Sequence, residues 1–322
     1  MMAGAQSQFN QFPQTKQLGQ TNPLSRATYR EFLMMTCSWP GERARACSLL
    51  IKVREAQNAE LPPLIWCGGM FEMDTIAAIC GTQRAIYGMR TSVDVVETTE
   101  QNIRQLGQYY ANEIVQVMPN NNTFLLAGNC IGAFLIYEVA TLLTQRGYKV
   151  GFLGIVDRDV TEGPLPLKLI RAAFYLIDTA GYTWHEIKNT KYASTKMAGL
   201  KHIGSTLLHA VTYISEVFHV TQFLKKLCSV IERNKASPTT ATIENAVVQT
   251  RYQLKPYAGD VHLFFIRWGV FGFYQFSFYQ QYWRKLIKGN TTVDIVRGHS
   301  HSHPNWSRII KKLNQRIVEA GF

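Results

Sequence analysis

The chain has 322 residues, of which 46% are hydrophobic and 17% charged, and its formal net charge is +12. This composition is that of a globular protein with a sizeable core, and it excludes an intrinsically disordered chain. The basic excess favours an acidic partner such as nucleic acid, anionic lipid or an acidic protein. Nucleic acid is disfavoured because the sequence has no nucleic-acid-binding module and no block of five adjacent basic residues.

The cysteines are scattered along the chain without a Cys-x-x-Cys pair, at positions 37, 47, 67, 80, 130 and 228. This distribution argues against a disulfide framework and a zinc site, and it predicts a reducing, cytoplasmic location. The N-terminus lacks the charged-then-apolar pattern of a signal peptide. The uncharged stretch 202–215 is too short to span a bilayer, so we expect a soluble protein without a membrane span.

The first sixty residues differ in pattern from the rest. Residues 1–22 are polar and rich in glutamine, and residues 24–60 carry mixed helical signals, so 1–60 is predicted to be an N-terminal extension that is partly flexible. A regular alternation then begins: strand 64–67, helix 72–78, strand 85–89, helix 99–118, strand 123–127, helix 131–145 and strand 150–156. Such alternation predicts an α/β fold with a mostly parallel sheet and helices on both faces.

The alternation stops in the middle of the chain. Residues 164–235 are helical and amphipathic in pattern and carry ten Lys or Arg against four Asp or Glu, which predicts a helical lid inserted at about 160–245. Strand 261–266, the aromatic-rich helix 275–287, strand 292–296 and a final basic helix 304–319 then complete the sheet pattern. Residues 61–322 are therefore predicted to form one α/β domain that contains the lid.

The most informative stretch is the turn between strand 123–127 and helix 131–145. Cys130 has Gly128 two residues before it and Gly132 two residues after it. This spacing is typical of a nucleophile elbow, whose strained turn tolerates only small neighbours at those positions. The turn presents the thiol above the sheet and points the first N–H groups of the following helix at a developing oxyanion. The position usually carries serine, and the alternative is an ordinary buried structural cysteine.

An acid and a histidine follow in the order that a catalytic triad requires. Asp157 ends the next strand, with Asp159 as a second candidate, and the last strand leads into His299, His301 and His303. Nucleophile, acid and histidine in this chain order are typical of α/β-hydrolases. The three histidines could instead bind a metal ion, although no acidic or cysteine partner lies near them in the sequence.

Five runs of the sequence carry a family resemblance: 109–114, 124–132, 137–142, 147–157 and 252–264. They resemble the thioesterase domains that release products from nonribosomal peptide and polyketide synthases. In that family the acid lies 27 residues after the nucleophile, which is the separation of Asp157 from Cys130. The resemblance implies the α/β-hydrolase fold and enzymatic action on a thioester.

The resemblance also assigns roles to individual residues. Cys130 takes the place of the nucleophile and Asp157 that of the acid that orients the histidine. The oxyanion hole would use the N–H of Ile131 and one N–H from the loop after the first strand, at Gly69 or Met70. The family places its histidine where this chain has Ser300, so a one-residue slip selects His301 or His299. We prefer His301 by a small margin.

The resemblance implies a substrate carried by a partner. The substrate would be an acyl or peptidyl chain on the phosphopantetheine of a carrier protein. The chain looks stand-alone, so the carrier is expected to act in trans, and the basic residues of the predicted lid favour an acidic carrier. No cofactor or metal is expected in the enzyme itself. An acyl group on Cys130 would remain a thioester, which suits transfer or ring closure as well as hydrolysis. The alternatives are an editing thioesterase that removes stalled acyl groups and a non-catalytic hydrolase-fold protein that binds an acyl chain or a partner.

The segment around Ser48 has a weaker resemblance to the carrier-protein segment that bears phosphopantetheine. The glycines that precede the serine in carriers are absent, since Arg45, Ala46 and Cys47 stand there. A helix with a linker, or the remnant of a carrier, is therefore expected in place of a working attachment site.

Overall fold

The computed structural model of the protein describes residues 41–45, 48–81, 83–91, 100–157, 177, 254–267, 280, 283–297 and 303–322. Residues 1–40, all of the predicted lid except Ile177, and both His299 and His301 lie outside these ranges. The predictions that concern them remain predictions.

The described strands form one eight-stranded sheet in the order β1-β2-β4-β3-β5-β6-β7-β8. Their bounds are β1 Glu42–Arg43, β2 Ile51–Arg54, β3 Leu64–Cys67, β4 Ile86–Met89, β5 Thr123–Asn129, β6 Lys149–Val156, β7 Val261–Arg267 and β8 Thr291–Arg297. All neighbouring pairs from β4 to β8 are parallel, whereas β1 and β2 pair antiparallel to each other and β2 pairs antiparallel to β4. The carboxyl ends of the parallel strands therefore meet along one edge of the sheet.

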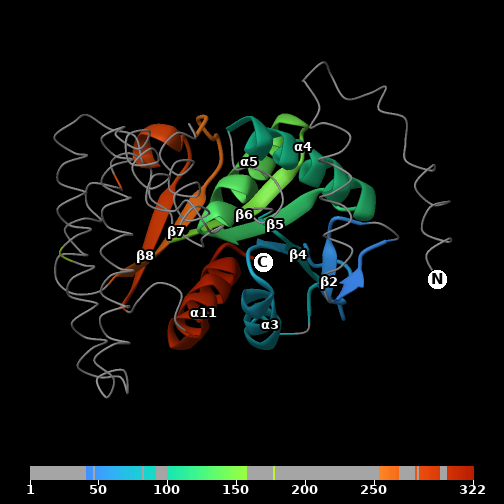
Figure 1. Ribbon diagram of the computed structural model, residues 1–322, viewed down its shortest axis with the longest axis horizontal. Helices are drawn as coiled ribbons and strands as arrows, with labels where there is room; N and C mark the ends of the chain where they lie inside the picture. Colours follow the sequence, from blue (N-terminus) through green and yellow to red (C-terminus); the bar gives the residue numbers. More distant parts are fainter. Residues whose placement is uncertain are drawn as a thin grey trace, which may run out of the picture.

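Helices cover both faces of the sheet (Figure 1). On one face lie α4 (Glu100–Val117) and α5 (Ile131–Gln145), and on the other lie α3 (Met70–Ile79) and α11 (His303–Glu319). The predicted α/β-hydrolase architecture, a mostly parallel sheet between two helical layers, is confirmed.

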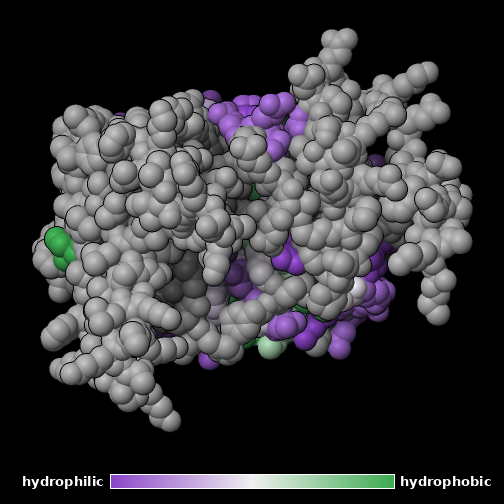
Figure 2. All heavy atoms as spheres, in the orientation of Figure 1, coloured by the Kyte–Doolittle hydropathy of each residue, from purple (hydrophilic) through white to green (hydrophobic). Residues whose placement is uncertain are grey.

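The core is divided by the sheet into two layers. Along β5, Leu126 packs with α4 and α5, whereas Leu125 and Ala127 pack with α3 and α11. All three side chains are fully buried, as expected for a central parallel strand with a helix layer on each face. Figure 2 shows hydrophilic residues at the top of the molecule, where α4 and α5 lie in Figure 1. Helix α4 exposes polar side chains such as Glu100, Gln101 and Gln116, whereas α5 is buried over most of its length.

The structure contains the helices and strands predicted for the described part of the domain, with small shifts in their first and last residues. Helix α5 has the predicted bounds, and α4, β5 and β6 differ from their predictions by one or two residues. Helix α3 begins two residues earlier than predicted, and α11 begins at residue 303 and ends at the predicted residue 319. Of the predicted helix 275–287, the structure describes residue 280 and residues 283–286 as helical.

Residues 42–43 and 51–54 belong to the sheet, although the sequence predicted an N-terminal extension over residues 1–60 with helical signals. Strand β2 pairs with β4, and β1 pairs with β2, so the sheet begins before residue 61. The alternation of Ile51, Lys52, Val53 and Arg54 is the period-two pattern of a half-buried strand. This pattern was the signal for a strand that the mixed composition of the segment obscured.

Ser48 is part of the fold and not a carrier attachment site. Its side chain is fully buried. Its hydroxyl donates to Glu113 Oε1 at 2.5 Å and accepts the N–H of Leu50 at 3.1 Å. The expected helix at this position is also absent, because residues 51–54 form β2. A serine that is enclosed in this way cannot carry a phosphopantetheine arm.

Acidification is expected to destabilise the fold through His262 in β7. The ring stacks on Phe152 with centroids 4.5 Å apart, and its Nδ1 lies 2.6 Å from Thr292 Oγ1. Burial, followed by the charge of Arg316, lowers the pKa of His262 below its ordinary value. As the pH falls through about 6.5, the unfolded chain takes up a proton that the folded chain resists, so the free energy of unfolding decreases.

Urea unfolding at about pH 8 and about pH 5.5 measures this effect, since exposed carboxylates titrate only at lower pH. The His262→Gln variant keeps a partner for Thr292 but cannot titrate. It should lose less stability between the two pH values than the wild type. Equal losses in both proteins would contradict the assignment to His262.

Candidate active site

Cys130 lies at a strained turn between β5 and α5. Its backbone has φ 53° and ψ −119°, outside the regions that residues with a side chain usually adopt. Its N–H donates to the carbonyl of Val156 in β6 at 3.1 Å, and its carbonyl accepts the N–H of Ala133 at 3.1 Å. Hydrogen bonds on both sides thus hold the strained residue in place, which is the local geometry of a nucleophile elbow.

The two flanking glycines are required by close backbone contacts. A Cβ on Gly128 would lie 2.6 Å from the carbonyl oxygen of Gly132. A Cβ on Gly132 would overlap the carbonyl oxygen of Cys67 at the end of β3. The elbow therefore fits between β5, α5 and β3 only because both positions lack side chains.

Asp157 is the counterpart of Cys130 on the neighbouring strand. Asn129 and Val156 are paired in the β5–β6 register, so Cys130 and Asp157 are the next residues along two adjacent parallel strands. Among the described residues other than glycine, these two alone have a positive φ. The N–H of Asp157 donates to Phe264 O at 2.7 Å, and its Oδ1 accepts the N–H of Ile266 at 3.4 Å. The predicted nucleophile and acid thus lie side by side at the carboxyl edge of the sheet.

The predicted histidines follow the carboxyl end of β8. Strand β8 pairs in parallel with β7, and β7 pairs with β6, so its carboxyl end lies on the same edge as Cys130 and Asp157. His299 and His301 themselves lie outside the described residues, as does Asp159, and the choice between the histidines stays a prediction. His303 is the first residue of α11.

The predicted oxyanion donors lie at the starts of two helices. Ile131 is the first residue of α5 and Met70 the first residue of α3. The first N–H groups of an α-helix have no acceptor within the helix and carry its positive dipole end. The N–H of Gly69, the third predicted donor, already donates to Glu72 Oε2 at 3.2 Å. Ile131 and Met70 are therefore the better pair of donors.

Glu72 is a residue of this region that the sequence analysis missed. Its carboxylate accepts hydrogen bonds from Trp66, Gly69 and Asn129, the residue before Cys130. The signal for it was its position: an acid three residues after the cap of a helix commonly accepts the N–H of the cap residue. That capping contact was predictable, whereas the contacts with Trp66 and Asn129 depend on the tertiary fold.

Cys130 differs from the other cysteines that the structure describes. Cys67 and Cys80 are buried, whereas Cys130 is partly exposed. Burial raises the pKa of the Cys67 thiol, with a further contribution from the negative charge of Glu72, and it raises the pKa of Cys80 to about 12. Because the thiolate is the reactive form of cysteine, these two thiols are unreactive near neutral pH.

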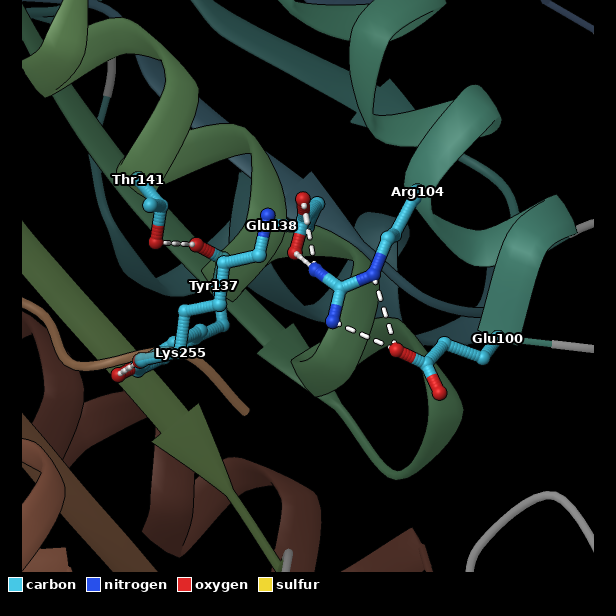
Figure 3. A network of polar contacts seen from close by, with 6 residues as sticks. All are labelled: Glu100, Arg104, Tyr137, Glu138, Thr141 and Lys255. Atoms are coloured by element: carbon cyan, nitrogen blue, oxygen red, sulfur yellow. Dashed lines mark hydrogen bonds and ion pairs between the residues drawn. The ribbon is translucent and has the colours of Figure 1, made fainter. Parts of the chain in front are cut away.

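A polar network fixes α5, the helix behind the elbow, against its neighbours (Figure 3). Arg104 of α4 lies between Glu100 of its own helix, at 2.7 Å, and Glu138 of α5, at 3.3 Å. Tyr137 immediately precedes Glu138 in α5, and its hydroxyl donates to the carbonyl of Lys255 at 2.6 Å. The helix that begins at the candidate nucleophile is thus tied both to α4 and to the segment that leads into β7.

Metal ligation and membrane insertion have no support in the described part of the chain. There, no group of three or more His, Cys, Asp and Glu side chains is arranged to hold a metal ion. The metal alternative rested on three histidines, of which His299 and His301 lie outside this part. None of the described helices combines the length and the apolar character that a membrane span requires.

Comparisons with known proteins place the chain in a family. The family model "Thioesterase domain" matches residues 90–315. Curated protein sequences gave no match.

Three solved structures illustrate the structural likeness. A Vlm2 thioesterase domain, bound with a dodecadepsipeptide, is 14% identical in sequence, with a TM-score of 0.49. The match spans 84% of this chain and 98% of the Vlm2 chain. YbtT, a type II thioesterase from the yersiniabactin pathway, is 15% identical, with a TM-score of 0.45. The match spans 84% of this chain and 96% of the YbtT chain. The four-domain nonribosomal peptide synthetase AB3403 is 17% identical, with a TM-score of 0.47. The match spans 84% of this chain and 20% of the synthetase chain.

The family match spans α4, the elbow, Asp157 and most of α11. The chain therefore belongs to the thioesterase domain family and is an enzyme of the class that acts on thioesters.

Proposed function

We propose that the protein is a thioesterase of the nonribosomal peptide or polyketide type that uses Cys130 as its nucleophile. It would take an acyl or peptidyl chain from the phosphopantetheine thioester of a carrier protein and pass it to water or to an amine or hydroxyl. The observation that carries the proposal is the elbow: a strained, partly exposed cysteine between two obligatory glycines, beside Asp157 on the paired strand. The family match and the sequence resemblance around residues 109–157 supply the substrate class.

The first half-reaction would form an acyl-enzyme. His301, or His299 in the alternative register, takes the proton of the Cys130 thiol, and Asp157 orients that histidine. The thiolate attacks the carbonyl carbon, and the N–H groups of Ile131 and Met70 stabilise the oxyanion. When the carbonyl re-forms, the carbon–sulfur bond to pantetheine breaks, and the leaving thiolate takes the proton from the histidine.

The second half-reaction would release the chain. Water, an amine or a hydroxyl attacks the Cys130 thioester while the histidine accepts its proton, and the Cys130 thiolate leaves and is reprotonated. The acyl group is a thioester both before and after its transfer to Cys130, so the step from carrier to enzyme exchanges bonds of the same kind. A thiolate is also a better leaving group than the alkoxide of serine, which favours transfer to a weak acceptor. These properties suit ring closure or acyl transfer as well as hydrolysis.

Turnover with a loaded carrier protein tests the proposal. The wild-type protein should release the acyl chain from an acyl-carrier thioester and regenerate the free carrier thiol. Cys130→Ala should reduce the rate by at least about 100-fold, the scale of loss when a catalytic group is removed. Cys80→Ala, at a buried thiol outside the site, is the control and should keep the rate. Equal rates in Cys130→Ala and the wild type would overturn the proposal.

A further inference from the structure

The carboxylate of Glu72 joins three elements around the elbow. Its Oε2 accepts the indole N–H of Trp66 in β3 at 2.9 Å and the backbone N–H of Gly69 at 3.2 Å. Its Oε1 accepts the side-chain amide of Asn129, at the end of β5, at 3.1 Å. Donors from β3, from the cap of α3 and from the elbow therefore meet on one carboxylate, although Glu72 and Asn129 are 57 positions apart in the sequence.

These contacts fix the two backbone segments that form the proposed oxyanion hole. Gly69 immediately precedes Met70, and Asn129 immediately precedes Cys130. The distance between the Met70 N–H and the thiol therefore depends on how the α3 cap sits against the elbow. The side chain of Glu72 hydrogen-bonds to both segments. Because the carboxylate of Glu72 accepts the N–H of Gly69, the N–H of Met70 is the next backbone donor in this turn that could face the oxyanion.

The surroundings of Glu72 hold its carboxylate in place. Asn129 is only 5% exposed and Trp66 is fully buried, so neither donor can exchange the carboxylate for bulk water. The carboxylate lies in the first turn of α3, where the helix dipole stabilises a negative charge. Trp66 in turn packs edge-on against Trp306 of α11, with ring centroids 6.1 Å apart.

We propose that Glu72 is a positioning residue of the active site, which sets the oxyanion donors at the start of α3 relative to Cys130. The inference rests on the proposed function, because it concerns the formation of the acyl-enzyme. Glu72 does not touch the reacting atoms and acts through Gly69 and Asn129. A displacement of about 1 Å in such a site reduces the rate by about 100-fold.

Two reactions of the same thiol separate positioning from a general structural role. Acylation by an acyl-pantetheine passes through an oxyanion, whereas alkylation by iodoacetamide displaces iodide and forms none. Glu72→Ala should lower the rate of Cys130 acylation by about 10- to 100-fold and leave its alkylation within about twofold of the wild type. The probes are acetyl-, hexanoyl- and dodecanoyl-pantetheine, and intact-protein mass gives both rates.

A conservative variant and a charge exchange provide the matched controls. In Glu72→Gln, the amide oxygen of the new side chain can accept hydrogen bonds from Trp66 and Gly69. Its amide N–H can donate to Asn129 Oδ1, an oxygen that has no hydrogen-bond donor among the described residues. This variant should keep acylation within about fivefold of the wild type, a change of about 1 kcal/mol in the barrier. Asn129→Asp places a second carboxylate against Glu72 and should impair acylation strongly. The double variant Glu72→Gln/Asn129→Asp restores a donor–acceptor pair and should recover the rate.

The outcomes distinguish this inference from the proposed function. If the wild-type protein forms no acyl adduct on Cys130 with any probe, the proposed function fails and the inference fails with it. If the wild type acylates and Glu72→Ala acylates equally fast, only the inference is overturned. Parallel losses of acylation and alkylation in Glu72→Ala would assign Glu72 a structural role and overturn it as well. Should Glu72→Ala not fold, recovery in the double variant supports the inference, and its absence overturns it.

Discussion

Replacing Gly132 with alanine is expected to destabilise the protein and disable the elbow. The new Cβ would overlap the carbonyl oxygen of Cys67 and lie 3.2 Å from its Sγ, so α5 and β3 would have to move apart. Alanine is the better helix former by about 1 kcal/mol, but overpacking against a backbone atom costs about 1–3 kcal/mol or more. We expect a net loss of about 1–2 kcal/mol in the free energy of unfolding. Acylation of Cys130 should slow by about 100-fold, because its donors would move by about 1 Å.

Urea unfolding and the acyl-pantetheine assay measure the two effects on Gly132→Ala. Gly81→Ala is the control, since a Cβ there would meet nothing within 4 Å. Its φ of +71° should cost about 1 kcal/mol of stability and leave acylation unchanged. A Gly132→Ala protein with the acylation rate of the wild type would contradict the tight contact between the elbow and β3.

Removing Arg104 is expected to weaken the fold, because it takes an ion-pair partner away from the buried carboxylate of Glu138. The Glu138 side chain is 5% exposed, and Arg104 donates to both of its oxygens, at 3.4 and 3.3 Å. Breaking a fully buried pair costs about 3–5 kcal/mol, and Arg104 is 25% exposed, so we expect Arg104→Ala to cost about 2–3 kcal/mol. Urea unfolding measures the loss directly.

Glu100 provides the matched control, because it binds the same arginine at the surface. Its side chain is 44% exposed, and exposed pairs contribute about 0.5 kcal/mol or less. Glu100→Ala should therefore be nearly neutral. The double variant Arg104→Met/Glu138→Leu, which removes both charges, should recover much of the stability that Arg104→Ala loses. If Arg104→Ala and Glu100→Ala have the same stability, the pair with Glu138 does not stabilise the fold.

The parts of the fold that the sequence predicted are those with local signals. The bounds of α5 followed from a strand, a glycine-flanked turn and a helical pattern that adjoin one another in the chain. The side-by-side placement of Cys130 and Asp157 followed from the rule that parallel strands end at one edge, and the register confirms it. These inferences needed no knowledge of which side chains touch.

The parts that the sequence did not predict depend on contacts between distant segments. Strand β1 has two residues and takes its place only by pairing with β2, so no periodic pattern identifies it. Likewise, the family resemblance implied Gly69 or Met70 as an oxyanion donor, whereas the folded chain directs the N–H of Gly69 to Glu72. A backbone donor can be assigned only when its competing acceptors are known, and these come from the tertiary structure.

The choice of cysteine at the elbow is the central chemical feature of the protein. The structure separates Cys130 from Cys67 and Cys80 by exposure, by backbone strain and by its place at the start of a helix. Each of these features favours a reactive thiol, because the helix N-terminus stabilises the thiolate and exposure admits the substrate.

Mass spectrometry of the acylated protein tests this account most directly. The wild-type protein is mixed with hexanoyl-pantetheine, its intact mass is recorded over time, and the adduct is located by peptide mapping. We expect one acyl group per chain, on Cys130, with no adduct in Cys130→Ala and no comparable labelling of the five other cysteines. An adduct that persists in Cys130→Ala, or equal labelling of all cysteines, would contradict a catalytic role for this thiol.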